Sequence, residues 1–124
     1  MDELRHALTR TPIVCVQNQY NLVDRSAQPV LDTCTEHGIA FVPFFPLGSA
    51  FGASGSVLGH PEVVAAAGRL GATPAQIALA WVLAIAPNTL LIPGTSSRAH
   101  LEENLGAGSV VLDQPTLDRL NAAA

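Results

Sequence analysis

Residues 91–105 read L-I-P-G-T-S-S-R-A-H-L-E-E-N-L and carry the strongest structural signal in this chain. The apolar residues at 89–92 predict a short buried strand, and the residues from Arg98 onward predict a helix. Between them lies a turn that combines Gly94 with three hydroxyl side chains, those of Thr95, Ser96 and Ser97. The first N–H groups of a helix lack partners within the helix and lie at the positive end of its dipole, so they attract phosphate. The stretch therefore predicts a phosphate-binding turn.

The same alternation of strand and helix runs through the rest of the chain. The sequence predicts strands over residues 13–17, 39–42 and 89–92, with Pro43 ending the second, and helices over 2–9, 29–37, 61–70, 74–86, 98–107 and 114–120. Apolar strands that alternate with helices are typical of right-handed parallel βαβ units. Three such strands leave two open sheet edges, so we predict an α/β fold that is part of a larger (β/α)₈ barrel. No repeat or linker divides the chain, so residues 1–124 are expected to form one domain.

Composition narrows the class of protein. Hydrophobic residues make up 48% of the 124 residues and charged residues only 13%, which excludes a disordered chain. The net charge of −4 gives no general attraction to nucleic acid or to an anionic membrane. The N-terminal residues do not resemble a signal peptide, and no run approaches the roughly 18 apolar residues of a membrane span. With Cys15 and Cys34 expected to be reduced thiols, we predict a soluble cytoplasmic protein.

Motifs for other kinds of chemistry are missing from the sequence. Neither a Walker loop nor a G-x-S-x-G turn after a strand is present, and residues 52–56 are expected to form a flexible lid. We predict no metal site, because the histidines are scattered without the spacing of metal ligands: His6, His37, His60 and His100.

Polar residues follow all three predicted strands at the same end. Gln17 and Asn18 follow the first strand, residues 44–49 follow the second, and residues 94–97 follow the third. Barrels of this kind carry their sites at the C-terminal ends of the strands. One shared site is therefore expected at that edge of the sheet.

Four blocks of the sequence resemble the aldo/keto reductases, in order and at suitable separations. They are V-Q-N-Q-Y-N-L-V-D-R (residues 16–25), G-I-A-F-V-P-F-F-P-L-G-S (38–49), A-T-P-A-Q-I-A-L-A-W-V-L (72–83) and I-P-G-T-S-S-R-A-H-L-E-E-N-L (92–105). The resemblance begins in the helix before the family's sixth strand and continues to its eighth helix. It implies a partial (β/α)₈ TIM barrel, roughly the last three βα units with a preceding helix, in an NADP-dependent oxidoreductase.

The resemblance also implies which residues bind the nicotinamide end of NADP(H). Gln17 matches a glutamine that bonds the nicotinamide carboxamide, although it could merely cap a loop. Phe44 matches an aromatic residue that stacks on the nicotinamide ring, although it could be an ordinary core residue. The loop that crosses the pyrophosphate is matched by Pro46, Leu47, Gly48 and Ser49.

For the adenosine end, the resemblance implies the turn and helix at residues 94–104. Gly94 and Thr95 stand where many relatives have Lys and Ser for the 2′-phosphate of NADP, so one cation is lost. Arg98 could supply that charge from the first turn of the helix, although it could instead be an exposed, solvated residue, and His100 stands where many relatives have Arg. The adenine edge is matched by Glu103 and Asn104, whose alternative is a solvated helix face.

The catalytic groups of the family are not matched in these 124 residues. The family uses a Tyr as general acid with Lys, Asp and His partners from the first half of the barrel. This sequence has no Lys, and Tyr20 does not stand in the acid position. Two interpretations follow. The chain is part of a reductase of aldehydes or ketones that needs a complementing N-terminal half, or it is a non-catalytic nucleotide-binding remnant that self-associates.

Overall fold

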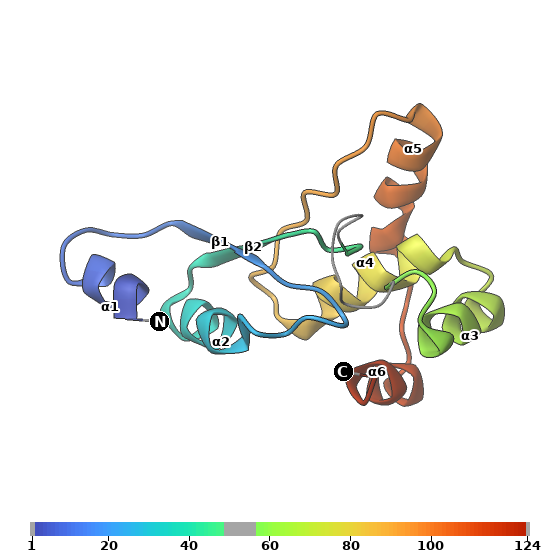
Figure 1. The fold of residues 1–124 in the computed structure, drawn as a ribbon, viewed down its shortest axis with the longest axis horizontal. Helices are drawn as coiled ribbons and strands as arrows, with labels where there is room; N and C mark the ends of the chain where they lie inside the picture. Colours follow the sequence, from blue (N-terminus) through green and yellow to red (C-terminus); the bar gives the residue numbers. More distant parts are fainter. Residues whose placement is uncertain (1, 49–56, 124) are drawn as a thin grey trace.

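The computed structural model describes residues 2–48 and 57–123. Two strands, β1 (Cys15–Gln19) and β2 (Ala40–Phe44), form a parallel sheet (Figure 1). The helices are α1 (Asp2–Leu8), α2 (Gln28–His37), α3 (Pro61–Leu70), α4 (Pro74–Ile85), α5 (Arg98–Gly106) and α6 (Gln114–Asn121), with a 3₁₀ turn, η1 (Ala107–Ser109). The predicted α/β class is confirmed, and the architecture is consistent with part of a barrel.

The predicted third strand is reduced to a single contact in the described part of the chain. Thr89 forms an isolated parallel bridge with Phe41 of β2. Phe41 N donates to Asn88 O at 2.9 Å, and Leu90 N donates to Phe41 O at 2.9 Å. Residues 89–92 therefore run beside β2 where a third strand was expected, without forming a regular ladder.

The prediction that Pro43 ends the second strand is wrong, because Pro43 lies inside β2. Alternate residues of β2 bond to β1, as shown by Ala40 N, which donates to Val14 O at 3.1 Å. The residues between them bond in the opposite direction, as Phe41 N does to Asn88 O. Pro43 is two residues after Phe41, so its missing N–H is on the side away from β1. The ladder with β1 is therefore not interrupted.

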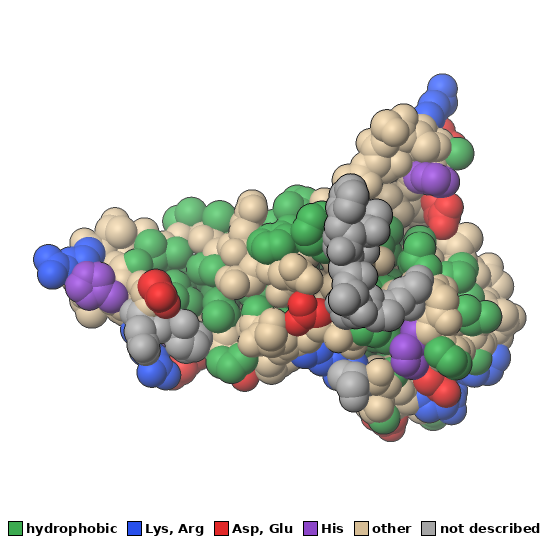
Figure 2. All heavy atoms as spheres, in the orientation of Figure 1, with side chains coloured by type: hydrophobic (Ala, Val, Ile, Leu, Met, Phe, Trp, Pro, Cys, Tyr) green, Lys and Arg blue, Asp and Glu red, His purple; other side chains and the backbone are tan. Residues whose placement is uncertain are grey.

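Helices cover one face of the sheet. Phe41 of β2 is buried in one apolar cluster with Leu31 of α2 and Trp81 of α4. Figure 1 shows α2 beneath the strands, and Figure 2 shows hydrophobic side chains at the surface along them. Parallel sheets are normally covered on both faces. Among the described residues, the other face instead presents exposed side chains: Cys15, Gln17, Phe44, Leu90 and Ile92.

Local signals explain the helix boundaries. Thr73 and Gln76 form a reciprocal capping box at the start of α4, as their spacing predicts. Gly38 ends α2 in the left-handed conformation, with φ of 66°.

Within the described residues, no individual helix is long and apolar enough to cross a membrane, although α3 and α4, bent by 99° to one another, pass that test together.

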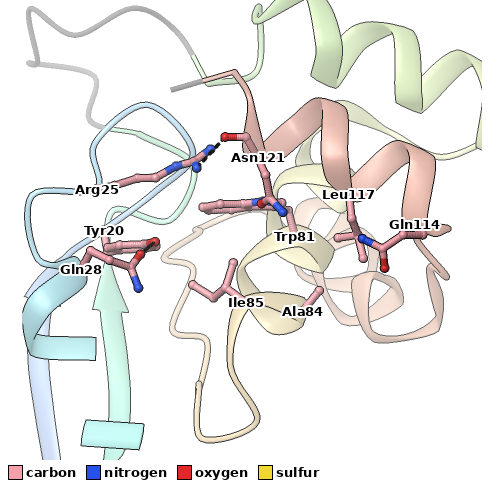
Figure 3. Close-up of a pocket in the computed structure, with 9 residues that line it drawn as sticks. All are labelled: Tyr20, Arg25, Gln28, Trp81, Ala84, Ile85, Gln114, Leu117 and Asn121. Carbon is pink, nitrogen blue, oxygen red and sulfur yellow. Dashed lines mark hydrogen bonds between the residues drawn. The ribbon is translucent and has the colours of Figure 1, made fainter. Parts of the chain in front are cut away.

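An arginine fixes the last helix against the end of β1 (Figure 3). The guanidinium of Arg25 lies 4.7 Å from the centre of the Trp81 ring. Its NH1 and NH2 groups donate to Asn121 O at 2.9 Å and to Leu120 O at 2.8 Å. A cation at the C-terminal carbonyls of a helix also interacts favourably with the helix dipole. α6 is thereby tied to the loop that follows β1.

Candidate functional site

Two adjoining hollows lie at the C-terminal end of β2. The first, the β2-side hollow, has a volume of about 310 Å³ and is lined by residues 44–48 and 92–94. The second, the α5-side hollow, has a volume of about 180 Å³ and is lined by Leu47, Leu58, Ala75, Gly94, Thr95, His100, Glu103 and Asn104. Leu47 and Gly94 line both hollows. The two hollows therefore adjoin and form one depression between the end of β2 and α5.

Most of the residues predicted from the sequence meet in these hollows. Eight of them are lining residues: Phe44, Pro46, Leu47, Gly48, Gly94, Thr95, Glu103 and Asn104. Gln17, Ser96 and Arg98 line neither hollow, and Ser49 lies outside the described residues. The lining residues Phe45, Leu58 and Ala75 were not assigned to the cofactor, although Phe45 and Ala75 lie within the blocks 38–49 and 72–83 that resemble the family.

Two phenylalanines form the wall of the β2-side hollow. The rings of Phe44 and Phe45 meet edge to face, with centroids 5.5 Å apart and planes at 79°, and both are partly exposed. The carbonyl O of Phe45 accepts from Gly48 N at 2.9 Å, which closes a tight turn. Gly48 has φ of 85°, and a Cβ there would lie 3.3 Å from Cγ2 of Val57. The turn therefore requires glycine at this position.

The start of α5 is capped by its own hydroxyls. Oγ of Ser97 accepts from His100 N at 3.3 Å, and Oγ1 of Thr95 accepts from Ser97 N at 3.1 Å. The helix thus begins where the sequence predicts. The hydroxyl oxygens of Thr95 and Ser97 accept these local bonds within the turn for which the sequence predicts phosphate binding.

Glu103 is held by the start of α4. Thr73 Oγ1 donates to Glu103 Oε1 at 2.5 Å, and Gln76 Nε2 donates to Glu103 O at 3.0 Å. The capping box at Thr73 was predicted, but its contact with α5 was not, because nothing in the sequence signals that the two helices meet there. The contact fixes one wall of the α5-side hollow.

Gln17 and Arg98 lie at the margins of this region. Gln17 pairs with Val42, so it is on the same face of the sheet as Phe44 and one pleat away from it. Arg98 is 91% exposed and forms an ion pair with Glu102, with Nε and Oε1 3.0 Å apart. Arg98 therefore does not line the α5-side hollow, whereas the imidazole of His100 does.

Tyr20 is a structural residue in this fold. Its ring stacks on Trp81 with centroids 6.0 Å apart, and its hydroxyl donates to Gln28 Oε1 at 2.5 Å (Figure 3). Burial raises the pKa of the Tyr20 phenol, so proton release is disfavoured. Tyr20 lines neither of the two hollows.

Other reactive groups form no cluster in the described part of the chain. No group of three or more His, Cys, Asp or Glu side chains there is arranged to hold a metal ion. Cys15 is exposed and Cys34 is buried, and neither is in a disulfide. Burial raises the pKa of the Cys34 thiol, which makes it less reactive.

The sequence model of the aldo/keto reductase family matches residues 1–124. Pyridoxine 4-dehydrogenase of Escherichia coli (strain K12) is 49% identical over 109 residues, which cover 88% of this chain and 36% of that protein. An uncharacterized oxidoreductase of Schizosaccharomyces pombe is 40% identical over 122 residues, covering 98% and 38%. The chain thus spans well under half the length of these relatives.

Solved structures show the same fold. An aldo/keto reductase of Klebsiella pneumoniae in complex with NADP and acetate is 29% identical, with a TM-score of 0.85 over 97% of this chain and 44% of that one. A thermostable aldo-keto reductase in complex with the inhibitor epalrestat is 33% identical, also with a TM-score of 0.85, over 98% of this chain and 44% of that one.

Proposed function

This chain belongs to the aldo/keto reductase family, and we propose that it supplies the NADP(H)-binding part of an oxidoreductase that reduces aldehydes or ketones. The observation that carries the proposal is the pair of adjoining hollows. Residues that the family resemblance assigns to the two ends of the cofactor come together there from β2 and α5, about 50 residues apart in sequence. The complex of the Klebsiella relative with NADP supports the choice of cofactor.

The nicotinamide end is assigned to the β2-side hollow. The exposed ring of Phe44 offers a flat apolar surface on which a nicotinamide ring can stack. Gln17 is one pleat away on the same face, within the reach of a carboxamide partner. The turn at Gly48 lets the backbone approach the pyrophosphate without hindrance from a side chain. The chain's own residues thus bind and orient the ring.

The adenosine end is assigned to the α5-side hollow. The N-terminus of α5 supplies backbone donors and a positive dipole end for the 2′-phosphate, with Thr95 and Ser96 beside it. The exposed Arg98 supplies a cation, and His100 supplies an imidazole that lines the hollow. Glu103 and Asn104 offer polar partners for the adenine edge. These contacts favour NADP over NAD, although less strongly than a Lys and an Arg would.

Hydride transfer needs groups beyond these residues. When bound, NADPH supplies the hydride, while the carbonyl oxygen of the substrate requires a proton donor. The described residues near the hollows include no Tyr or Lys, since Tyr20 is buried against Trp81 and the sequence has no Lys. We assign the proton donor and the carbonyl pocket to a complementing N-terminal half of the barrel, which would also cover the exposed face of the sheet.

The exposed apolar face of the sheet supports a second candidate function, which can also be tested. The exposed apolar residues on the open face, such as Leu90 and Ile92, favour association between copies of the chain. In that case the chain is a non-catalytic, self-associating nucleotide-binding remnant. It would bind NADPH but gain no activity from a complementing half.

The deciding experiment is a fluorescence titration of the purified chain with NADPH, with NADH in parallel. We expect saturable binding that prefers NADPH. Phe44→Ala should raise the dissociation constant for NADPH about tenfold, because stacking is worth roughly 1 kcal/mol or more. Leu105→Ala, at an exposed residue that lines neither hollow, should leave it unchanged.

Two outcomes separate the alternatives. Failure of a folded chain to bind either nucleotide would contradict the proposed cofactor site. If the chain binds NADPH, addition of the N-terminal half of a family member should restore oxidation of NADPH by an aldehyde. Binding without any such restoration would favour the remnant.

A further inference from the structure

Asn21 joins the end of β1 to the turn after β2. Its side chain is buried, with 2% of its surface exposed. Oδ1 accepts from Val23 N at 3.1 Å and from Asp24 N at 2.9 Å, so it shapes its own loop. Nδ2 donates across to the carbonyl O of Phe45 at 3.1 Å. One carboxamide therefore has partners in two loops that are 24 residues apart in sequence.

The carbonyl that Asn21 holds belongs to a residue with an unfavourable backbone conformation. Phe45 has φ of 53°, and it is the one non-glycine residue with positive φ in the described ranges 2–48 and 57–123. A bulky L-residue adopts this conformation only when surrounding contacts impose it. The Phe45 carbonyl has two donors, Asn21 Nδ2 and Gly48 N. Asn21 is the long-range member of that pair.

The conformation of Phe45 sets the shape of the β2-side hollow. It turns the chain sharply after β2, so that the Phe45 ring meets Phe44 edge to face and the following residues line the hollow. Phe44 itself is anchored through its carbonyl, which accepts from Tyr20 N at 3.4 Å. Asn21 follows Tyr20, so two consecutive residues after β1 hold the carbonyls of Phe44 and Phe45.

We propose that Asn21 is a positioning residue for the nicotinamide end of the cofactor: its Nδ2–Phe45 O bond holds the left-handed turn that presents the Phe44 ring. The inference rests on the proposed function, because it assigns that ring to nicotinamide stacking. Asn21 does not touch the cofactor. Its effect is confined to the β2-side hollow, since the side chain bonds to Phe45, Val23 and Asp24, which all lie in the loops after β1 and β2.

The test replaces Asn21 by Asp. Asn21→Asp keeps an oxygen for Val23 N and Asp24 N and removes the donor to Phe45 O. Asn88→Asp is the matched control, because Asn88 Nδ2 likewise donates to a backbone carbonyl, that of Ile39, at 2.7 Å. Ile39 precedes β2, so the control makes the same chemical change at the opposite end of the same strand.

Two ligands separate positioning from general damage. NADPH carries the nicotinamide, whereas 2′,5′-ADP carries only the adenosine end with its 2′-phosphate. By calorimetry, Asn21→Asp should weaken NADPH about tenfold and 2′,5′-ADP less than about twofold, as expected for one lost bond to a backbone carbonyl. Asn88→Asp should leave the ratio of the two affinities unchanged. Equal weakening of both ligands by Asn21→Asp, or the same selective loss in Asn88→Asp, overturns the proposal.

A readout without ligand distinguishes failure of this proposal from failure of the proposed function. If the unmodified chain binds neither nucleotide, the proposed function fails, and amide NMR still tests Asn21. Asn21→Asp should then shift the amide signals of Phe44, Phe45 and Gly48 while those of residues 94–104 stay in place. Unchanged signals at Phe45 and Gly48 contradict the role. If Asn21→Asp does not fold, Asn21→Ser, which keeps an oxygen for the loop but lacks the Nδ2 group that reaches Phe45 O, replaces it in the same measurements.

Discussion

Thr73, the N-cap of α4, donates its hydroxyl proton to the Glu103 carboxylate of α5, 30 residues away, while the same oxygen accepts from Gln76 N at 3.2 Å. A single hydroxyl thus starts one helix and orients a side chain on another. Because Glu103 lines the α5-side hollow, the stability of α4 and the shape of that hollow are linked through this atom.

Thr73→Val should therefore have two effects. Loss of the cap should lower the free energy of unfolding by about 1 kcal/mol, and release of Glu103 should weaken binding of 2′,5′-ADP severalfold. Thr73→Ser, which keeps the hydroxyl, should change neither quantity. Asp113→Ala is the matched control, since Asp113 caps α6 through a bond from Thr116 N at 2.9 Å. It should cost similar stability in urea denaturation without a change in nucleotide affinity.

Arg98→Ala should weaken NADPH more than NADH. Arg98 is highly exposed and paired with Glu102, so its contribution to a 2′-phosphate is modest, about threefold in the dissociation constant. Glu102→Gln, which removes the competing carboxylate, should leave NADPH binding equal or tighter. Equal losses for both nucleotides in Arg98→Ala would exclude a role for Arg98 at the 2′-phosphate.

His100→Arg should tighten binding of 2′,5′-ADP about fivefold, measured by calorimetry at low salt. His100 lines the α5-side hollow, and a guanidinium provides a permanent charge and a forked set of donors for phosphate. Leu101→Arg is the control, because it adds the same charge to α5 at a residue that lines neither hollow. A gain of similar size in the control would show that only net charge matters.

The phenol of Tyr20 should ionise above its ordinary pKa of about 10, because burial raises its pKa in the folded chain. Below pH about 10, Tyr20 is protonated in both states and does not affect stability. Above it, the unfolded chain releases the proton first, so the free energy of unfolding falls with rising pH. The sequence has one Tyr, so phenolate absorbance reports this group alone. Tyr20→Phe should remove the contribution of this group to the alkaline slope, and a pKa at or below 10 would contradict the prediction.

Self-association should depend on the open face of the sheet. Leu90 of that face and Leu101 of α5 have similar exposed fractions, 56% and 50%. Leu90→Lys should shift the chain toward monomer in sedimentation velocity, since a charge on an exposed sheet opposes pairing. Leu101→Lys should not. A monodisperse monomer of the unmodified chain would contradict the self-association on which this comparison depends.

Features set by neighbouring residues could be predicted from the sequence. The bounds of α3, residues 61–70, were predicted as observed, because Pro61 begins the helix and Gly71 ends it locally. Strand bounds depend on pairing instead. The first strand was predicted two residues early. β2 continues through Pro43 because the missing N–H of this proline lies on the side of the strand away from β1.

Contacts between distant segments were harder to predict. The resemblance linked Phe44 and residues 46–48 with Gly94 and Asn104, and the two hollows bring these residues together. No pattern in the sequence predicts the bonds that fix the hollows, from Thr73 to Glu103 and from Asn21 to Phe45. Each depends on how two separately formed elements meet in space.

The contacts of Arg25 have a consequence for synthesis on the ribosome. This side chain is near the beginning of the chain, yet two of its donors end on Leu120 and Asn121, more than 90 residues later. Until those residues emerge, the guanidinium has no carbonyls of α6 to bind, and Trp81 Nε1 lacks the Asn121 Oδ1 that it meets at 2.9 Å. The packing of the loop after β1, α4 and α6 around this aromatic ring is therefore completed only after α6 has left the exit tunnel.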